Sequence, residues 1–173
     1  MVALQIRGII MKGDKKIIDI LNHLLTGELT ASDQYLIHGE MVSDLGLPGL
    51  AAHMLHESEH EHLHAKLIIQ RILFLEGTPN VAKRDALNIG ENVKDMLESD
   101  LALEYSVVKH LKKAIEACEK AEDFVTRDML VKQLDDTEMD HAYWLEKQLK
   151  LIKLVGLGNY LQNQMQAASV KGI

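Results

Sequence analysis

The sequence predicts an all-α protein, a four-helix bundle with one long crossover connection and a short fifth helix near the C-terminal end. Hydrophobic residues make up 47% of the 173 residues but aromatic residues only 4%. The core must therefore consist mainly of aliphatic side chains, Met and Ala, which favour helices. Neither Gly nor Pro occurs between Glu91 and Val155, a length that suits two helices joined by a polar turn. Apolar residues also recur at the i, i+3, i+4, i+7 spacing of a buried helix face.

Gly and Pro divide the remaining chain into helix-sized segments. They cluster at "GLPG" (46–49), "GTP" (77–79), Gly90 and "GLG" (156–158), and such clusters mark turns. A polar turn is also expected at "EKAED" (119–123), because Phe124 begins a new apolar stripe. We therefore predict helices over residues 15–45, 50–76, 91–119, 122–155 and 158–167.

The lengths of the connections predict how these helices are arranged. Short turns join the first helix to the second and the third to the fourth, so each pair should form an antiparallel hairpin. The segment "GTPNVAKRDALNIG" (77–90) shows no clear periodicity. It is long enough to cross the bundle lengthwise, which would make the second and third helices parallel.

Charge and cysteine content exclude several classes of protein. The formal net charge is −7 and no basic block occurs, which argues against a nucleic-acid partner. No segment reaches the roughly 18 apolar residues of a transmembrane helix, and the N-terminal residues lack the features of a signal peptide. We therefore expect a cytoplasmic protein without a membrane partner. Cys118 is the single cysteine, so we expect a reduced thiol within a helix.

Each of the four long predicted helices carries charged or imidazole side chains inside its apolar stripe. A buried carboxylate is unfavourable unless it is paired or bound to a metal. Two divalent metals would balance four glutamates, and two neutral histidines would complete the ligand shells. One Glu from each of two helices plus Glu-x-x-His from the other two is the known ligand pattern of di-iron carboxylate bundles. The charged and imidazole residues within the stripes are Glu28, Glu57, Glu61, His64, Glu104, Glu138 and His141.

The stretch "HESEHEHLH" (56–64) contains three overlapping Glu-x-x-His pairs, and spacing selects one of them. The interval from Glu28 to Glu61 nearly equals the interval from Glu104 to Glu138, so the two halves have the same form. Folding the first hairpin about residue 47 also brings Glu28 closer to Glu61 and His64 than to Glu57. On a helical wheel, Glu59 and His62 lie about 160° and 100° from Glu61. The sequence thus predicts a centre formed by Glu28, Glu61, His64, Glu104, Glu138 and His141.

Several motifs resemble bacterioferritin and the related bacterial ferritins. They are "LLTGELTASDQYLIH", "RILFLEGTPN", "LNIGENVKDMLESDLALEYS", "DTEMDHAYWLEKQL" and "GLGNYLQNQ", and the resemblance runs from about Met11 to Gln164. It implies a ferritin-like fold and a cage of 24 subunits that oxidises Fe(II) with O2 or peroxide and stores the Fe(III) mineral. It also implies that residues 1–10 form an extension and that residues 11–173 form one ferritin-like domain.

The resemblance assigns roles to the residues selected above. All six match the ligands of the family's dinuclear ferroxidase centre, which holds two iron ions per subunit. Glu61 and Glu138 would bridge the two ions, whereas Glu28 and Glu104 would be terminal ligands. Tyr35 matches a tyrosine near that centre and Trp144 a tryptophan proposed to pass electrons, with ordinary core packing as the alternative for both. A ferredoxin would be the partner for iron release.

One position departs from the family pattern. Bacterioferritins ligate haem b between two subunits with a Met from each, one residue after the bridging Glu. That position is His62 here, and Met54 lies eight residues, or about 12 Å, away along the helix. We therefore expect a haem-free subunit, or one that assembles with a haem-binding bacterioferritin subunit. We prefer a solvated or interface role for His62 over haem ligation.

Two weaker correspondences concern iron transit and the cage channels. Some family members bind iron on the inner surface through a His and an Asp four residues apart, and these positions are His56 and His60 here. A transit site at His56, Glu57 and His60 and a simple solvated face both remain open. Asn159 and Gln162 fall where the fifth helix lines a pore between subunits.

Three functions fit these observations to different degrees. The leading hypothesis is a ferroxidase subunit of a storage cage, either a homo-24-mer or a hetero-oligomer. The alternative is a non-enzymatic structural subunit of a heteromeric cage, although the intact set of six ligands argues against it. A di-metal oxygenase or catalase would usually need a substrate cavity and further domains, and the short chain favours the cage.

Overall fold

The computed structural model describes residues 13–165, which form helices without any β-strand. The predicted all-α bundle with a crossover and a short last helix is confirmed. Residues 166–167 of the expected last helix and the expected extension of residues 1–10 lie outside the described part. The elements in chain order are α1 (Lys15–Asp44), α2 (Pro48–Phe74), α3 (Val93–Lys120), α4 (Phe124–Asp136), the π-helical turn η1 (Thr137–Ala142), α5 (Tyr143–Val155) and α6 (Leu157–Gln164).

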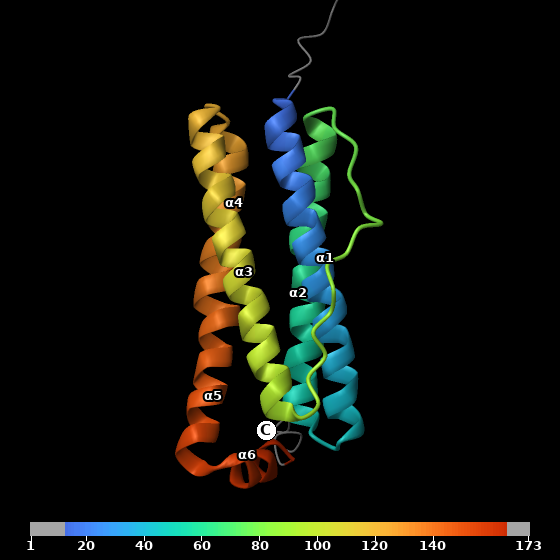
Figure 1. Cartoon of the computed structure of the whole chain (residues 1–173), viewed down its shortest axis with the longest axis vertical. Helices are drawn as coiled ribbons and strands as arrows, with labels where there is room; N and C mark the ends of the chain where they lie inside the picture. The colour runs from blue at the N-terminus through green and yellow to red at the C-terminus, as the bar shows by residue number, and fades with distance from the viewer. Residues whose placement is uncertain (1–12, 166–173) are drawn as a thin grey trace, which may run out of the picture.

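The helices have the predicted arrangement (Figure 1). The first hairpin consists of α1 and α2, and the second of α3 and the rod made by α4, η1 and α5. The crossover of residues 75–92 runs along the outside of the first hairpin to the opposite end, so α2 and α3 are parallel, as expected. The short helix α6 lies across the lower end of the bundle. One expectation is wrong in detail, because η1 interrupts the helix predicted as continuous over residues 122–155.

Side chains at the first residues explain where three helices begin. The Asp14 carboxylate accepts a hydrogen bond from the Lys16 backbone N–H at 2.7 Å, and Asn92 and Asp123 cap α3 and α4 in the same manner. Such caps satisfy amide groups that have no partner within the first turn. At α2 the first residue is Pro48, whose fixed φ suits a helix start.

Side chains of α1 hold the crossover in place. The backbone N–H of Asn88 donates to Gln34 Oε1 at 3.0 Å, and the backbone N–H of Gly90 donates to His38 Nε2 at 3.2 Å. Because His38 accepts at Nε2, its neutral ring carries the proton on Nδ1, 2.8 Å from Asp100 Oδ1. His38 and Asp100 are fully buried. The crossover is thereby tied through α1 to α3.

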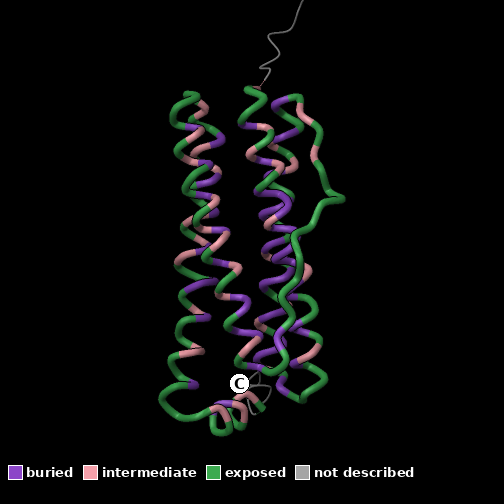
Figure 2. The backbone as a smooth tube through the Cα atoms, in the orientation of Figure 1, coloured by how far each residue is buried: buried purple, intermediate pink, exposed green. Residues whose placement is uncertain are grey.

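The apolar core is divided into two clusters at opposite ends of the bundle. Buried positions follow the inward faces of the helices (Figure 2). One cluster includes Leu21, Ile72 and Leu111, and the other includes Met54 and Leu97. Between them lies a belt of buried polar side chains, described below. Cys118 lies in a helix, as expected, and belongs to the first cluster, where burial raises its pKa to about 11.

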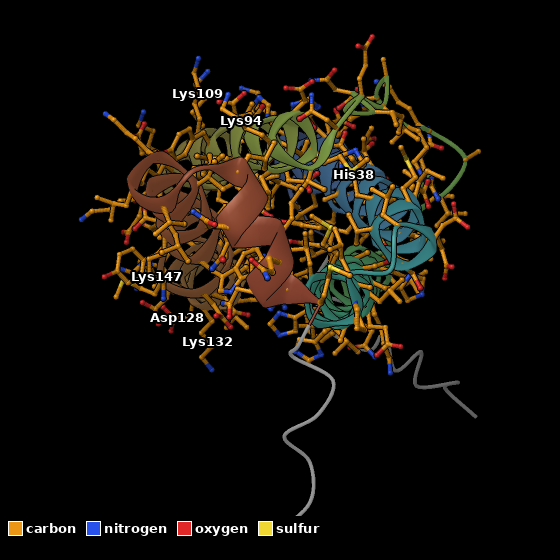
Figure 3. The ribbon with its side chains drawn as sticks, turned by 90° about the horizontal axis from the view of Figure 1, so that it is seen from below. His38, Lys94, Lys109, Asp128, Lys132 and Lys147 are labelled. Carbon is orange, nitrogen blue, oxygen red and sulfur yellow. The ribbon has the colours of Figure 1, made fainter. Side chains whose placement is uncertain are left out.

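The outer faces of the bundle are charged. In the view along the bundle, Lys94, Lys109, Lys132 and Lys147 lie at the rim, whereas His38 lies among the helices (Figure 3). This is the distribution expected for helices with one buried stripe. No helix within residues 13–165 combines the length and apolarity needed to cross a membrane.

We expect Gly90→Ala to destabilise the protein, because a Cβ at this position would lie 2.6 Å from the Asp95 carbonyl carbon and 2.7 Å from Met96 Cα. The start of α3 would have to shift, at a cost of about 1–3 kcal/mol in the free energy of unfolding. The matched control is Gly27→Ala, where a Cβ meets nothing within 4 Å. Because Gly27 lies inside α1, this change should stabilise by about 0.5–1 kcal/mol. Urea unfolding followed by circular dichroism would measure both changes, and equal stability of the two variants would contradict the close contact.

Candidate metal centre

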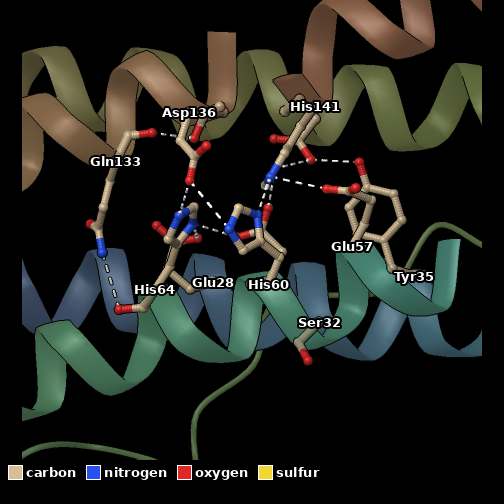
Figure 4. Close-up of polar contacts among 12 residues, drawn as sticks. Glu28, Ser32, Tyr35, Glu57, His60, His64, Gln133, Asp136 and His141 are labelled. Atoms are coloured by element: carbon tan, nitrogen blue, oxygen red, sulfur yellow. Dashed lines mark hydrogen bonds and ion pairs between the residues drawn. The ribbon is translucent and has the colours of Figure 1, made fainter. Parts of the chain in front are cut away.

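Five of the six predicted ligands meet in the polar belt, and Figure 4 labels Glu28, His64 and His141 among them. Every long helical rod contributes at least one side chain to the group, and all five are buried. The bundle thus places three carboxylates and two imidazoles together in its interior. They are Glu28 from α1, Glu61 and His64 from α2, Glu104 from α3 and His141 from η1.

These side chains form two overlapping groups that share Glu61. Glu28, Glu61 and His64 form one group and Glu61, Glu104 and His141 the other, and in each the ligand atoms lie within 4.8 Å of one another. Glu61 Oε2 is 3.2 Å from His64 Nδ1, whereas Glu61 Oε1 is 2.7 Å from His141 Nδ1. Each oxygen of Glu61 therefore faces a different histidine, the arrangement needed for one carboxylate to bridge two metal ions.

Several carboxylate oxygens in this centre lack a hydrogen-bond donor. Both oxygens of Glu28 and Oε2 of Glu104 are buried without a partner. A buried, unpaired carboxylate is strongly unfavourable, and a cation would supply the missing contacts. Carboxylate oxygens together with imidazole nitrogens suit iron, manganese or zinc. The residues present therefore fit a pair of such ions.

The pKa shifts of the side chains in the centre also show that the buried carboxylates need compensating positive charge. Burial, followed by the nearby charge of Glu61, raises the pKa of Glu28 well above its ordinary value and raises the pKa of Glu104 to about 7. Burial alone would lower the pKa of His141, but its contacts with Glu104, Glu57 and Glu61 outweigh burial and raise it. Burial likewise opposes ionisation of Glu61, yet its contacts with His141 and His64 lower its pKa. Without metal, protons therefore partly balance the buried carboxylates.

Two further carboxylates contact the outer nitrogens of the histidines. Asp136 Oδ2 lies 2.9 Å from His64 Nε2, and Glu57 Oε2 lies 3.0 Å from His141 Nε2 (Figure 4). A carboxylate on the far nitrogen holds a proton there and leaves Nδ1 free to bind metal. His60 lies between the two rings, with its Nδ1 2.9 Å from His141 Nε2. Sequence analysis placed Glu57 in the buried stripe but did not identify Asp136, which precedes the predicted pair.

Glu138 is not brought into this cluster, which corrects its expected place in the core. Its carboxylate pairs with Lys112 at 2.5 Å, and its side chain is 41% exposed. The physical reason is the π-helical turn. Glu138 and His141 are three residues apart and would share one face of an α-helix, but the wider turn of η1 separates them.

The aromatic residues singled out from the sequence lie close to the centre. Tyr35 is buried, and its hydroxyl donates to Glu104 Oε1 at 2.6 Å. It therefore holds one of the candidate ligands in position. Trp144 packs beside the second apolar cluster and stacks on His53 with ring centroids 3.6 Å apart. His53 in turn lies 3.6 Å from Glu57, so this stack reaches the outer edge of the centre.

The remaining predicted positions are solvent-accessible. His62 is exposed on α2, and His56 is exposed with its ring centroid 5.9 Å from that of His60. Asn159 and Gln162 are exposed on α6, and the Asn159 amide donates to the Val155 carbonyl. None of these four joins the cluster, whereas His60 does.

A cavity gives access to the histidines from outside. It measures about 580 Å³ and lies between α2 and α4. Its polar lining consists of His60, His64, Asp128, Lys132, Gln133 and Asp136, and its apolar lining includes Leu63, Leu67 and Met129.

Comparisons with known proteins agree with the fold. The family model described as Ferritin-like domain matches residues 18–155. A bacterial ferritin of Synechocystis is 51% identical over 155 residues, covering 90% of this chain and 99% of that protein, and one of Pseudomonas aeruginosa is 52% identical over the same length, covering 90% and 100%. A bacterioferritin of Mycobacterium bovis is 40% identical over 146 residues, covering 84% and 91%. The chain therefore belongs to the ferritin family.

Proposed function

We propose that this chain is an iron-storage subunit with ferroxidase activity, which oxidises Fe(II) and deposits Fe(III) as mineral inside a cage of 24 subunits. The observation that carries the proposal is the buried group of three carboxylates and two histidines that share Glu61. The unpartnered oxygens of Glu28 and Glu104 call for a cation. The names of the relatives and the family match support iron as that cation.

Two Fe(II) ions are the substrate of this centre. One would bind at Glu28 and His64, the other at Glu104 and His141, with Glu61 between them. Each Fe(II) gives up one electron, and the two electrons together with two protons reduce either hydrogen peroxide to two molecules of water or O2 to hydrogen peroxide. Tyr35 holds Glu104 through its hydroxyl, while Asp136 and Glu57 keep the two imidazoles in the tautomer that can bind metal.

Membership of the ferritin family supports proposals about the location, assembly and redox partner of this chain. We propose a cytoplasmic cage, either homomeric or mixed with a haem-binding bacterioferritin subunit, and a ferredoxin as the reductant for iron release. His62 is exposed, so in a cage it would be free to lie at a subunit contact without ligating haem. A second candidate, a structural subunit without activity, is less well supported, because such a subunit has no need of buried ligands whose carboxylates lack donors.

Replacing His141 by Ala should slow Fe(II) oxidation by at least about tenfold, because it removes one of the two imidazole ligands and leaves Glu61 and Glu104 without their partner. The initial rate of the Fe(III) absorbance rise after mixing the metal-free protein with Fe(II) in air would measure the effect. His23→Ala is the matched control, since His23 is exposed on α1. Equal rates for both variants and the parent would mean that this centre does not oxidise iron.

Metal loading should release protons. In the metal-free protein the pKa of Glu104 is about 7, and the pKa values of Glu28 and His141 are raised as well. A metal ligand must be deprotonated, so a divalent ion displaces these protons at pH 6.5. The contribution of Glu104 should vanish as the pH rises above about 7, where its proton is already lost. Zn(II) titration in a weakly buffered solution with a pH electrode would count the protons, and uptake without release would contradict the assigned ligands.

Size-exclusion chromatography with an ultraviolet–visible scan should show a cage-sized species without a Soret band. The absence of haem is expected because an imidazole at His62 differs in length and shape from the thioether that the family uses. Adding haem b to the purified cage tests the site directly. A monomer would overturn the storage function, and a Soret band would overturn our interpretation of His62.

A further inference from the structure

Two histidines outside the polar belt lie in contact between α1 and α3. The ring centroids of His23 and His110 are 4.6 Å apart, and the ring planes are inclined by 72°. Every other contact between histidine rings in residues 13–165 has a larger centroid separation, from 5.1 to 5.9 Å. His23 is exposed and His110 is half-buried. The closest pair of imidazoles is therefore accessible to solvent and separate from the buried centre.

The two rings border a small cavity. It measures about 260 Å³, and its apolar lining consists of Ile20, Leu24 and Ala114. Lys113 is the remaining polar residue of the lining. Within residues 13–165, neither imidazole makes a hydrogen bond or an ion pair, so the nitrogens of both rings are available to a ligand.

The separation of the rings suits two imidazoles bound to one metal ion. A ligating ring nitrogen lies about 2.0–2.1 Å from a zinc ion, which puts the ring centroid roughly 3.2 Å from the ion. Ligand angles of about 90–110° then place the two ring centroids about 4.5–5.2 Å apart. The observed separation of 4.6 Å lies within this range. An ion therefore needs the rings to turn about their side-chain bonds, without any change in the separation of the helices.

The charges around the pair favour neutral imidazoles. Burial, followed by the neighbouring His23, lowers the pKa of His110, and two lysines lower the same pKa further. The ring of His110 is thus uncharged near pH 7, as a metal ligand must be. The lysines, Lys109 and Lys113, are exposed, so water and salt screen their repulsion of a cation. The charge of Asp85 in the crossover acts on His110 in the opposite direction and attracts a cation.

We propose that His23 and His110 form a second metal site, which binds one divalent late transition-metal ion. Imidazole nitrogen suits Cu(II), Zn(II) and Ni(II), and among these Cu(II) binds most tightly to a given set of ligands. Fe(III) prefers carboxylate oxygen, whereas the two rings offer only nitrogen. The site therefore differs in chemistry from the buried centre. It shares no residue with that centre, so it does not depend on the proposed function.

Equilibrium dialysis of the metal-free, full-length protein against Cu(II) at pH 7.5 tests the proposal, with the bound copper counted per subunit. The parent should hold one ion more than His23→Ala or His110→Ala. Each replacement should weaken binding of this ion by at least about tenfold, because even the loss of a group that only orients a ligand costs that much. The double variant should lose no more copper than either single variant, since both rings hold the same ion.

The matched control is His62→Ala, because His62 is exposed on α2 and no other histidine ring contacts it within residues 13–165. This variant should bind as much copper as the parent. Electron paramagnetic resonance adds a second readout. The copper signal that the parent has and His23→Ala lacks should carry the hyperfine pattern of two imidazole nitrogens.

Four results would overturn the site. They are equal copper content in the parent and both single variants, a loss in only one of the two, losses that add in the double variant, and an equal loss in His62→Ala. If His110→Ala fails to fold, His23→Ala and the resonance spectrum decide, because His23 is exposed and its replacement leaves the core unchanged. A difference signal with a single nitrogen would then contradict the pair.

Discussion

The structure depends on the burial of three carboxylates and two histidines in the middle of an apolar bundle. Glu28, Glu61 and Glu104 are at most 1% exposed, and desolvating such groups without compensation is strongly unfavourable. The two apolar clusters on either side provide the free energy that keeps the belt closed. In the metal-free chain, protons on the carboxylates and on His141 reduce the charge repulsion. A cation bound by these residues would replace the protons.

Three further polar side chains position the residues of this centre. Tyr35 donates to Glu104, Asp136 faces His64 and Glu57 faces His141. Each contact involves a different helix from the ligand that it holds. A shift between helices would therefore disturb several contacts at once, which couples the packing of the bundle to the geometry of the site. The network formed by His38, Asp100 and Gln34 fastens the crossover to the same bundle, so the long connection need not contribute a strand or helix of its own.

The rod formed by α4, η1 and α5 shows how one added residue changes which side chains a helix turns towards the core. An α-helix would keep Glu138 and His141 on one face, but the π turn retains only His141 in the core and turns Glu138 towards Lys112. Thr137 becomes the buried neighbour instead. The sequence contained the signal for this difference, since the Glu-to-Glu interval is longer by one residue in the second half than in the first. Helical-wheel reasoning treats that difference as negligible, because it presumes about 3.6 residues per turn along the whole helix.

The helical class, the five helical segments, the lengthwise crossover and five of the buried polar side chains of the candidate centre could all be predicted from the sequence. Apolar periodicity, breaks at Gly and Pro, and charged residues within apolar stripes are local features, and each constrains the same fold. Only the tertiary structure decided that Glu57, His60 and Asp136 surround the histidines and that Glu138 does not. These contacts join residues of α2 to residues of α4 and η1, which are far apart in the chain. They depend on the rotation of each helix about its axis. That rotation results from packing all four rods together, and no single helix encodes it.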